Sequence, residues 1–338
     1  MLFPPTTARF RAQRDLGFFY VPDYGSVDPS GAADSSTAFQ AALDAMNASP
    51  YGGEVVCPPG RFKIATGLTL PDMGYDAAHG WGYQVGRAIR GPGWGSCTLV
   101  AASGLTAPIL TATGNITAGI PNVDISDIGF NGNANTGMTD GVVKLDRVAW
   151  SKLTRVVIQG ATGGSSFAPI GLNVLDVVHG VYENLVVNSC GTGIKFTQPN
   201  SMTCNHTVMR NVWAVGCSSW GIDVQSGSPF VIEGVDLEAG TGSGVRYNYT
   251  GGRLTIAGPL YYEGLSSGAM FDITAGYARI SGPIHGVMGG IQNRGTTNLT
   301  VEDWIDSATC TNATGAVLNN VRSPGLTGSG GTTNTWHS

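Results

Sequence analysis

The sequence has few charged side chains: 18 Lys and Arg against 23 Asp and Glu, or 12% of 338 residues. No basic cluster stands out that could neutralise a row of phosphates, so nucleic acid is not an expected partner. No apolar run approaches the roughly 20 residues of a membrane span, so membrane insertion is not expected either. The six cysteines form no CxxC and no paired metal-ligand spacing, which predicts buried free thiols in place of a zinc site or a redox motif.

The N-terminal residues are also not expected to form a secretory signal. Three arginines in the first fourteen residues precede an apolar stretch that Pro22 closes, and this stretch is too short for the apolar part of a signal peptide. We expect residues 1–22 to form an N-terminal arm that attaches the chain to a partner. At the other end, residues 306–338 are rich in Gly, Ser and Thr, which predicts a flexible tail.

Glycine and hydrophobic residues are abundant, with 51 glycines and a hydrophobic share of 42%. This composition suits short strands joined by tight turns around a large core. Only one helix is predicted, with Asp34 as a candidate N-cap. Its apolar residues recur at the i, i+3, i+4, i+7 spacing of an amphipathic helix: Phe39, Ala42, Leu43 and Met46.

From about residue 122, short strands recur in rows of 23 to 29 residues. The rows begin at Ile128, Val156, Leu185, Val212, Val235, Pro259 and Pro283. A single row of short strands cannot bury its own apolar face and must stack on its neighbours. We therefore predict an all-β chain, a right-handed single-stranded parallel β-helix with one N-terminal capping helix. It would span residues 23–305, with the cap and first coils in 23–121 and regular coils in 122–296. A β-sandwich with similarly spaced strands is the alternative.

Alternation within a row places the first and third residues inward and the second and fourth outward. The predicted inward set is Val156, Ile158, Leu185, Val187, Val212, Leu237 and Ile256. Asn184 and Asn211 hold the same position in consecutive rows, which suggests a stacked amide ladder.

Several motifs in the first hundred residues resemble the opening of the pectate-lyase superfamily. They are Asp23-Tyr24-Gly25, Asp34 with Thr37-Ala38-Phe39-Gln40-Ala41-Ala42, Gly52-Gly53, Pro58-Pro59-Gly60-Arg61-Phe62, and Gly91-Pro92-Gly93. The resemblance is greatest to the branch of rhamnogalacturonase-like, epimerase-like and bacteriophage tailspike β-helices. It implies the fold but not the reaction, because members of one fold carry different chemistries.

The chain departs from the superfamily's enzyme signatures. The Asn-Thr-Asp, Asp-Asp, Gly-His-Gly and Arg-Ile-Lys motifs of polygalacturonases are absent, which disfavours that hydrolase. Three carboxylates, Asp236, Glu238 and Glu263, could hold the calcium ion of a pectate lyase, but no Arg or Lys shares their row frame. No other metal and no cofactor is expected. Because no signal peptide is expected, the viral branch is favoured, whose tailspikes imply a homotrimer on a virion surface.

The outward positions bring polar and aromatic side chains together on one face. Asp236 and Glu238 leave one strand on the same side about 7 Å apart, within the roughly 5 to 9.5 Å between carboxyl groups that glycoside hydrolysis needs. The candidate catalytic residues are Asp236, Glu238 and Glu263, and the candidate carbohydrate-binding residues are Trp213, Tyr262, Asn188 and Gln159. Solvated side chains without a role, or glycan contact without catalysis, remain alternatives.

Three histidines, His179, His206 and His285, fall at different row positions and are not expected to share a column. His285 is expected in the core beside Tyr261.

The expected function is a bacteriophage fibre or tailspike-type subunit that binds a bacterial surface polysaccharide, with its degradation left open. The alternatives are a non-enzymatic structural or adhesive virion β-helix, and a free polysaccharide lyase, glycoside hydrolase or epimerase. Other virion proteins would bind through the arm.

Overall fold

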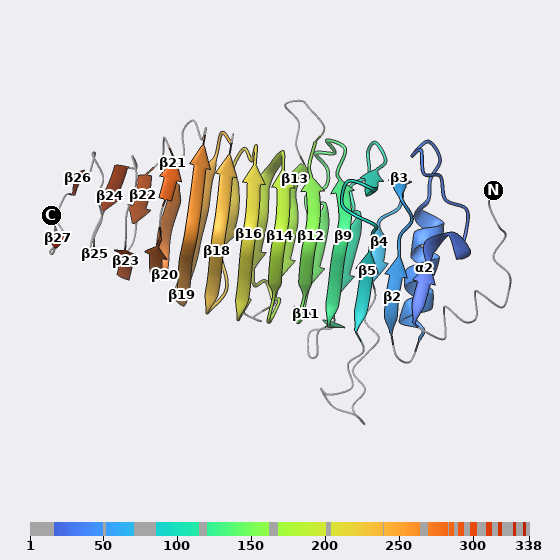
Figure 1. Cartoon of the computed structure of the whole chain (residues 1–338), viewed down its shortest axis with the longest axis horizontal. Helices are drawn as coiled ribbons and strands as arrows, with labels where there is room; N and C mark the ends of the chain where they lie inside the picture. The colour runs from blue at the N-terminus through green and yellow to red at the C-terminus, as the bar shows by residue number, and fades with distance from the viewer. Residues whose placement is uncertain are drawn as a thin grey trace, which may run out of the picture.

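The computed structural model shows a stack of parallel strands with one helix at its N-terminal end (Figure 1). It describes residues 17–49, 52–70, 86–114, 120–161, 168–200, 204–238, 240–263 and 270–282, and beyond these the backbone of the short strands between 284 and 335. All strand pairings in the main sheet are parallel, and each strand pairs with the equivalent strand of the next coil. The predicted parallel β-helix is confirmed.

Three sheets run along the stack, and the longer strands contribute to more than one of them. Sheet I contains β1 (Phe18–Tyr20), β2 (Gly53–Val56), β5 (Arg87–Arg90), the first parts of β9 (Val123–Asn131), β12 (Lys152–Gln159), β14 (Val181–Asn188), β16 (Thr207–Val215) and β18 (Phe230–Glu238), the middle of β19 (Ser243–Glu263), the end of β20 (Phe271–Ser281), and β23 (Asn298–Glu302), β25 (Val317–Asn319) and β27 (Asn334–Thr335). Sheet II contains β3 (Gly60–Ile64), β6 (Cys97–Ala101), the second parts of β9, β12, β14, β16 and β18, the end of β19, and β21 (Ile284–Gly286). Sheet III contains β4 (Leu68–Leu70), β7 (Leu110–Thr113), β10 (Val143–Asp146), β13 (Ala168–Leu175), β15 (Cys190–Thr197), β17 (Trp220–Val224), the starts of β19 and β20, and β22 (Gly290–Asn293), β24 (Thr309–Asn312) and β26 (Thr327–Gly328). Two short strands, β8 (Ile120–Pro121) and β11 (Val148–Ala149), pair separately.

The N-terminal end is closed by helix α2 (Ser36–Asn47), which follows the short 3-10 turn η1 (Val21–Asp23). The four predicted apolar residues of the helix are buried, and the Phe39 ring packs 5.3 Å from that of Phe62 on β3. Asp34 lies one residue ahead of the N-cap position, so the predicted cap is displaced. Its carboxylate instead accepts hydrogen bonds from the Ser36 amide and hydroxyl at 3.0 and 2.6 Å.

The bend between sheets I and II is made by one residue per coil in the left-handed backbone region. Asp127, Arg155, Asn184 and Asn211 have φ between 50° and 57°, a conformation that Asn and Asp tolerate better than most residues. Asn211 donates to the Asn184 amide oxygen at 3.4 Å, which confirms the predicted amide ladder. In the preceding coils Arg155 makes a two-pronged ion pair with Asp127 at 2.5 and 2.6 Å.

The space between the sheets is filled by one continuous apolar core. All seven residues predicted to point inward are at most 1% exposed: Val156, Ile158, Leu185, Val187, Val212, Leu237 and Ile256. Edge-to-face aromatic contacts link successive coils, with Phe196 at 5.6 Å from Tyr182 and 4.8 Å from Phe230. Full burial of such side chains contributes roughly 1.5 to 3 kcal/mol each, so the core supplies most of the stabilisation.

Both predicted ends differ from the structure. Residues 18–20 pair with β2, and Phe19 and Val21 lie in the core, so the predicted arm over 1–22 can comprise at most its first part. Residues 1–16 lie outside the described residues. The predicted tail over 306–338 contains parallel pairings that continue to Thr335, because backbone hydrogen bonds can extend a sheet where the apolar pattern has faded.

Five cysteines, Cys57, Cys97, Cys190, Cys204 and Cys217, are buried free thiols, as predicted. The side chain of Cys310 lies outside the described residues. Within the described part of the chain, no helix combines the length and hydrophobicity of a membrane span.

Candidate functional site

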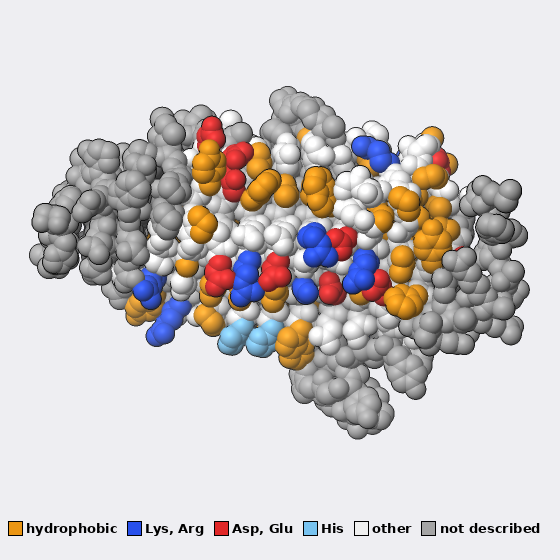
Figure 2. Space-filling view, viewed as in Figure 1, with side chains coloured by type: hydrophobic (Ala, Val, Ile, Leu, Met, Phe, Trp, Pro, Cys, Tyr) orange, Lys and Arg blue, Asp and Glu red, His pale blue; other side chains and the backbone are white. Residues whose placement is uncertain are grey.

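The three predicted catalytic carboxylates meet on the outer face of sheet II. Asp236 and Glu238 leave the end of β18, and Glu263 leaves the end of β19 in the next coil. The backbone register pairs Glu238 directly with Glu263, and Asp236 with Tyr261. We call Asp236, Glu238, Glu263 and Tyr261 the acidic cluster. Figure 2 shows acidic and hydrophobic side chains gathered at this end of the described surface.

Asp236 has the most unusual environment of the cluster. Partial burial, the nearby charge of Glu238, a hydrogen bond with Glu238 and the charge of Glu263 together raise its pKa from 3.8 to about 7. Its Oδ1 atom is buried and has no hydrogen-bond partner among the described residues. A carboxyl group that keeps its proton near neutral pH can act as a general acid.

The separation between the carboxyl groups of the cluster differs from the one that strand alternation predicts. Asp236 and Glu238 were placed about 7 Å apart, but their carboxyl groups converge to share a hydrogen bond. Glu263 lies diagonally across from Asp236, one strand over and two residues along. Strand geometry puts the Cβ atoms of such a pair about 8 Å apart, which falls in the range for two carboxyls that flank a glycosidic bond and a water.

The prediction that Tyr262 lines this face is wrong. Tyr262 is fully buried, while its neighbour Tyr261 is 42% exposed and donates its hydroxyl hydrogen to Glu263 at 2.5 Å. The cause is an irregularity in β19: Glu233 pairs with Ala257 but Val235 pairs with Leu260. The extra residue at Gly258, whose φ is +88°, shifts the rest of the strand by one position and exchanges its faces. Tyr261 is thus an outward residue, and the side chain of His285, which pairs with it through the backbone, lies outside the described residues.

The other predicted carbohydrate-binding residues lie on the same sheet at increasing distances from the acids. Trp213 is 52% exposed and pairs directly with Asp236. Asn188 and Gln159 occupy the same register position as Glu238, two and three coils before it. Gln159 accepts a hydrogen bond from Asn131 at 3.2 Å, and Asn188 accepts one from Ser189 at 2.6 Å. Trp213 therefore joins the acidic cluster, and the two amides extend the polar surface away from it.

The expectation that the histidines share no column is wrong for His179 and His206. His179 stacks on Trp150 at 5.5 Å between ring centroids with an angle of 4°, and His206 stacks on His179 at 4.8 Å. These three side chains form the aromatic ladder, which lies at the turn before sheet I, and Figure 2 shows its two imidazoles side by side. A common offset could have revealed it, since each residue stands two positions before one of three residues that pair in register in sheet I: Lys152, Val181 and Val208.

Among the described residues, no group of three His, Cys, Asp or Glu side chains is arranged to hold a metal ion. The acids of the cluster are instead engaged with one another and with Tyr261.

Comparison with solved structures finds several proteins whose folds are similar to that of this chain. The chain aligns over 95% of its length with DFA-IIIase from Arthrobacter chlorophenolicus A6 (TM-score 0.61, 10% identity, 87% of that chain). It aligns over 94% with the mannuronan C-5 epimerase AlgE4 A-module of Azotobacter vinelandii (TM-score 0.57, 18% identity, 100% of that chain). It aligns over 92% with tailspike protein 3 of bacteriophage CBA120 (TM-score 0.58, 14% identity), and spans about half, 52%, of that chain. At these identities the likeness shows the fold alone.

No curated protein sequence matches the chain at a significant level. A family model described as rhamnogalacturonase A/epimerase, pectate lyase-like, matches residues 18–246. This segment covers more than half of the 338 residues and runs from β1 through the coil that carries Asp236 and Glu238. The chain therefore belongs to the rhamnogalacturonase A/epimerase, pectate lyase-like family of β-helix proteins.

Proposed function

We propose that the chain is a virion-attached fibre or tailspike-type subunit that binds a bacterial surface polysaccharide and hydrolyses it at the acidic cluster. The observation that carries the catalytic part is Asp236, a carboxyl group with a pKa of about 7 beside two further carboxylates and the exposed rings of Trp213 and Tyr261. Membership of a family named for enzymes of polysaccharide metabolism supports this part.

The cluster can divide the roles of a glycoside hydrolase. Asp236 holds a proton near neutral pH because partial burial and the neighbouring Glu238 disfavour its charged form, and it would donate this proton to the leaving glycosidic oxygen. Glu263, on the far side of the bond, would accept a proton from water as the water oxygen attacks the anomeric carbon. Tyr261 fixes the Glu263 carboxylate through its hydrogen bond, and Trp213 offers a ring on which a sugar can stack.

The virion role is supported by the tailspike among the structural neighbours. A tailspike-type subunit would be expected to act as a homotrimer and to join other virion proteins through the residues before β1. A subunit that binds without cleaving, or a free enzyme, would use the same outer face.

The test is a degradation screen. The protein is incubated with purified bacterial capsular polysaccharides and O-antigen chains at pH 6, and new reducing ends are measured. Asp236→Asn removes the transferable proton and keeps the shape of the side chain, and Glu238→Gln removes the group that shares it. Each should lower the rate about a hundredfold or more while binding is largely retained.

Glu233→Gln is the matched control, because Glu233 is an exposed carboxylate on the same strand that pairs with Arg210 on sheet I, away from the cluster. It should leave the rate unchanged. Cleavage that proceeds equally in the parent, Asp236→Asn and Glu238→Gln would remove the cluster from the chemistry. Binding without new reducing ends would favour the non-enzymatic subunit.

A further inference from the structure

A groove crosses the first coils of sheet I, away from the acidic cluster. Its volume is about 960 Å³, near the upper end of the range for pockets that hold ligands. It runs across β1, β2, β5, β9 and β12, one coil per strand. Four steps of about 4.8 Å make it about 19 Å long, which suits an oligosaccharide better than a single sugar.

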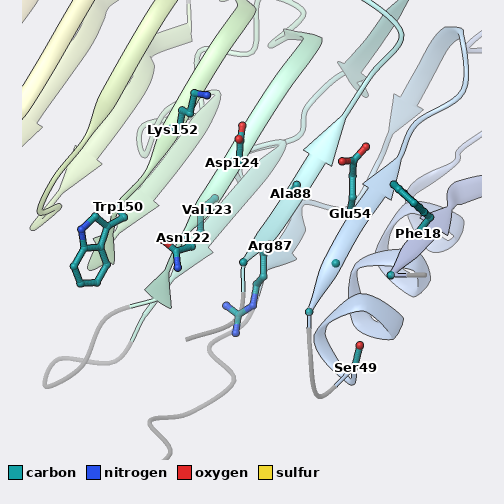
Figure 3. A pocket seen from close by; sticks show the side chains of 14 residues that line it. Phe18, Ser49, Glu54, Arg87, Ala88, Asn122, Val123, Asp124, Trp150 and Lys152 are labelled. Atoms are coloured by element: carbon teal, nitrogen blue, oxygen red, sulfur yellow. The ribbon is translucent and has the colours of Figure 1, made fainter. Parts of the chain in front are cut away.

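Aromatic rings stand at the two ends of this groove, as Figure 3 shows. Phe18 on β1 is 45% exposed at one end, and Trp150, just before β12, is 43% exposed at the other. Exposed aromatic rings at the ends of a groove provide stacking surfaces for the apolar faces of sugars.

The Trp150 ring is held in place from one side. His179 of the next coil covers that side at 5.5 Å with nearly parallel planes, and His206 supports His179. The groove lies on the other side of Trp150, toward β9. A ring already fixed in this way loses little conformational freedom when a ligand stacks on it.

The lining of the groove carries both signs of charge among its apolar residues. Two acids, Glu54 and Asp124, and two bases, Arg87 and Lys152, line it, so a ligand without strong net charge meets a balanced surface. The Oδ1 atom of Asp124 is buried without a hydrogen-bond partner in the described part of the chain. Burial raises the pKa of this carboxyl, although Lys152, Arg90 and Arg155 counteract the rise. The Asp124 carboxylate also lines the groove, where it can accept a hydrogen bond from a sugar hydroxyl.

We propose that this groove is a second, non-catalytic glycan site that holds a weakly charged oligosaccharide segment between Phe18 and Trp150 through stacking and hydrogen bonds to Asp124. It would anchor the polymer while another segment reaches the acidic cluster. The inference takes from the proposed function that the ligand is a polysaccharide, but it does not require cleavage.

The experiment measures binding of the same capsular polysaccharides and O-antigen chains by affinity electrophoresis. Trp150→Ala should weaken binding about tenfold, whereas Trp150→Phe should keep most of the parental affinity. Asp124→Asn should weaken binding by several-fold. Trp94→Ala is the matched control, since Trp94 is 55% exposed but lies outside the groove, and it should bind like the parent. Equal thermal unfolding temperatures would show that the variants remain folded.

The two proposals fail in different ways. If Trp150→Ala and Asp124→Asn bind like the parent while Trp213→Ala binds more weakly, the groove is not a glycan site and the acidic cluster stands. If the groove variants lose affinity while Asp236→Asn leaves degradation unchanged, the groove stands and the catalytic proposal falls. A parent protein that binds no polysaccharide of the panel overturns both.

Discussion

Replacing Asp236 with asparagine should stabilise the protein at neutral and alkaline pH. In the unfolded chain this carboxyl loses its proton near 3.8, but in the folded protein it does so near 7. Between these pH values Asp236 binds a proton more often in the folded state than in the unfolded state. Its contribution to the stability of the protein therefore falls as the pH rises from 4 to 7. A shift of this size corresponds to about 4 kcal/mol if the group were shielded from water. Because Asp236 is only partly buried, solvent screening reduces the expected gain to roughly 1 to 2 kcal/mol.

The assay compares denaturant unfolding of the parent and of Asp236→Asn between pH 4 and 8. The two should be close at pH 4, where both side chains are neutral, and the variant should gain steadily until about pH 7 and then level off. Asp127→Asn is a control of opposite sign, since Arg155 holds the pKa of Asp127 below its usual value. It should lose stability relative to the parent as the pH rises through the range below about 4, so the series for this control is extended down to pH 2. A constant difference between Asp236→Asn and the parent at every pH would refute the reasoning.

Three further predictions concern the faces and ends of the stack. Tyr262→Ala should cost about 3 to 5 kcal/mol of unfolding free energy because the ring is fully buried, whereas Tyr261→Ala should stay within about 0.5 kcal/mol; equal costs in denaturant unfolding would contradict the assigned register. Trp213→Ala should weaken binding of the cleaved polysaccharide by about 1 to 2 kcal/mol in titration calorimetry without a change in unfolding temperature, and unchanged affinity would exclude stacking on this ring. Deletion of residues 1–16 should leave a folded β-helix, because β1 begins at Phe18. The deletion should abolish attachment to purified virions that lack the protein. If the shortened protein sediments with these virions at the parental level, the arm proposal is wrong.

The residues that point into the core could be predicted from the sequence, because side chains alternate along a strand and each coil must stack on its neighbours. Val187 and Leu237 are inward since each follows another apolar residue at a spacing of two in a row that must rest on its neighbours. The same argument placed Asp236 and Glu238 on one outer face, where the structure has them beside Glu263.

What the sequence did not predict depends on single insertions and on tertiary contacts. The extra residue at Gly258 exchanged the faces of Tyr261 and Tyr262 without changing the apparent spacing of the rows. The aromatic ladder was missed because Trp150, His179 and His206 are 29 and 27 residues apart, and the row frame did not include the turns. The groove joins residues from five coils, among them Phe18 and Trp150, which no local pattern connects.

The pH dependence of polysaccharide hydrolysis tests the central claim most directly. If Asp236 donates the proton with a pKa of about 7, the rate of reducing-end release by the parent should be high at pH 6 and fall about tenfold per unit once the pH exceeds the pKa. The same profile measured for Asp236→Asn should lack this alkaline fall and lie about a hundredfold lower at pH 6. A parental rate that stays constant or rises between pH 7 and 9 would contradict the account.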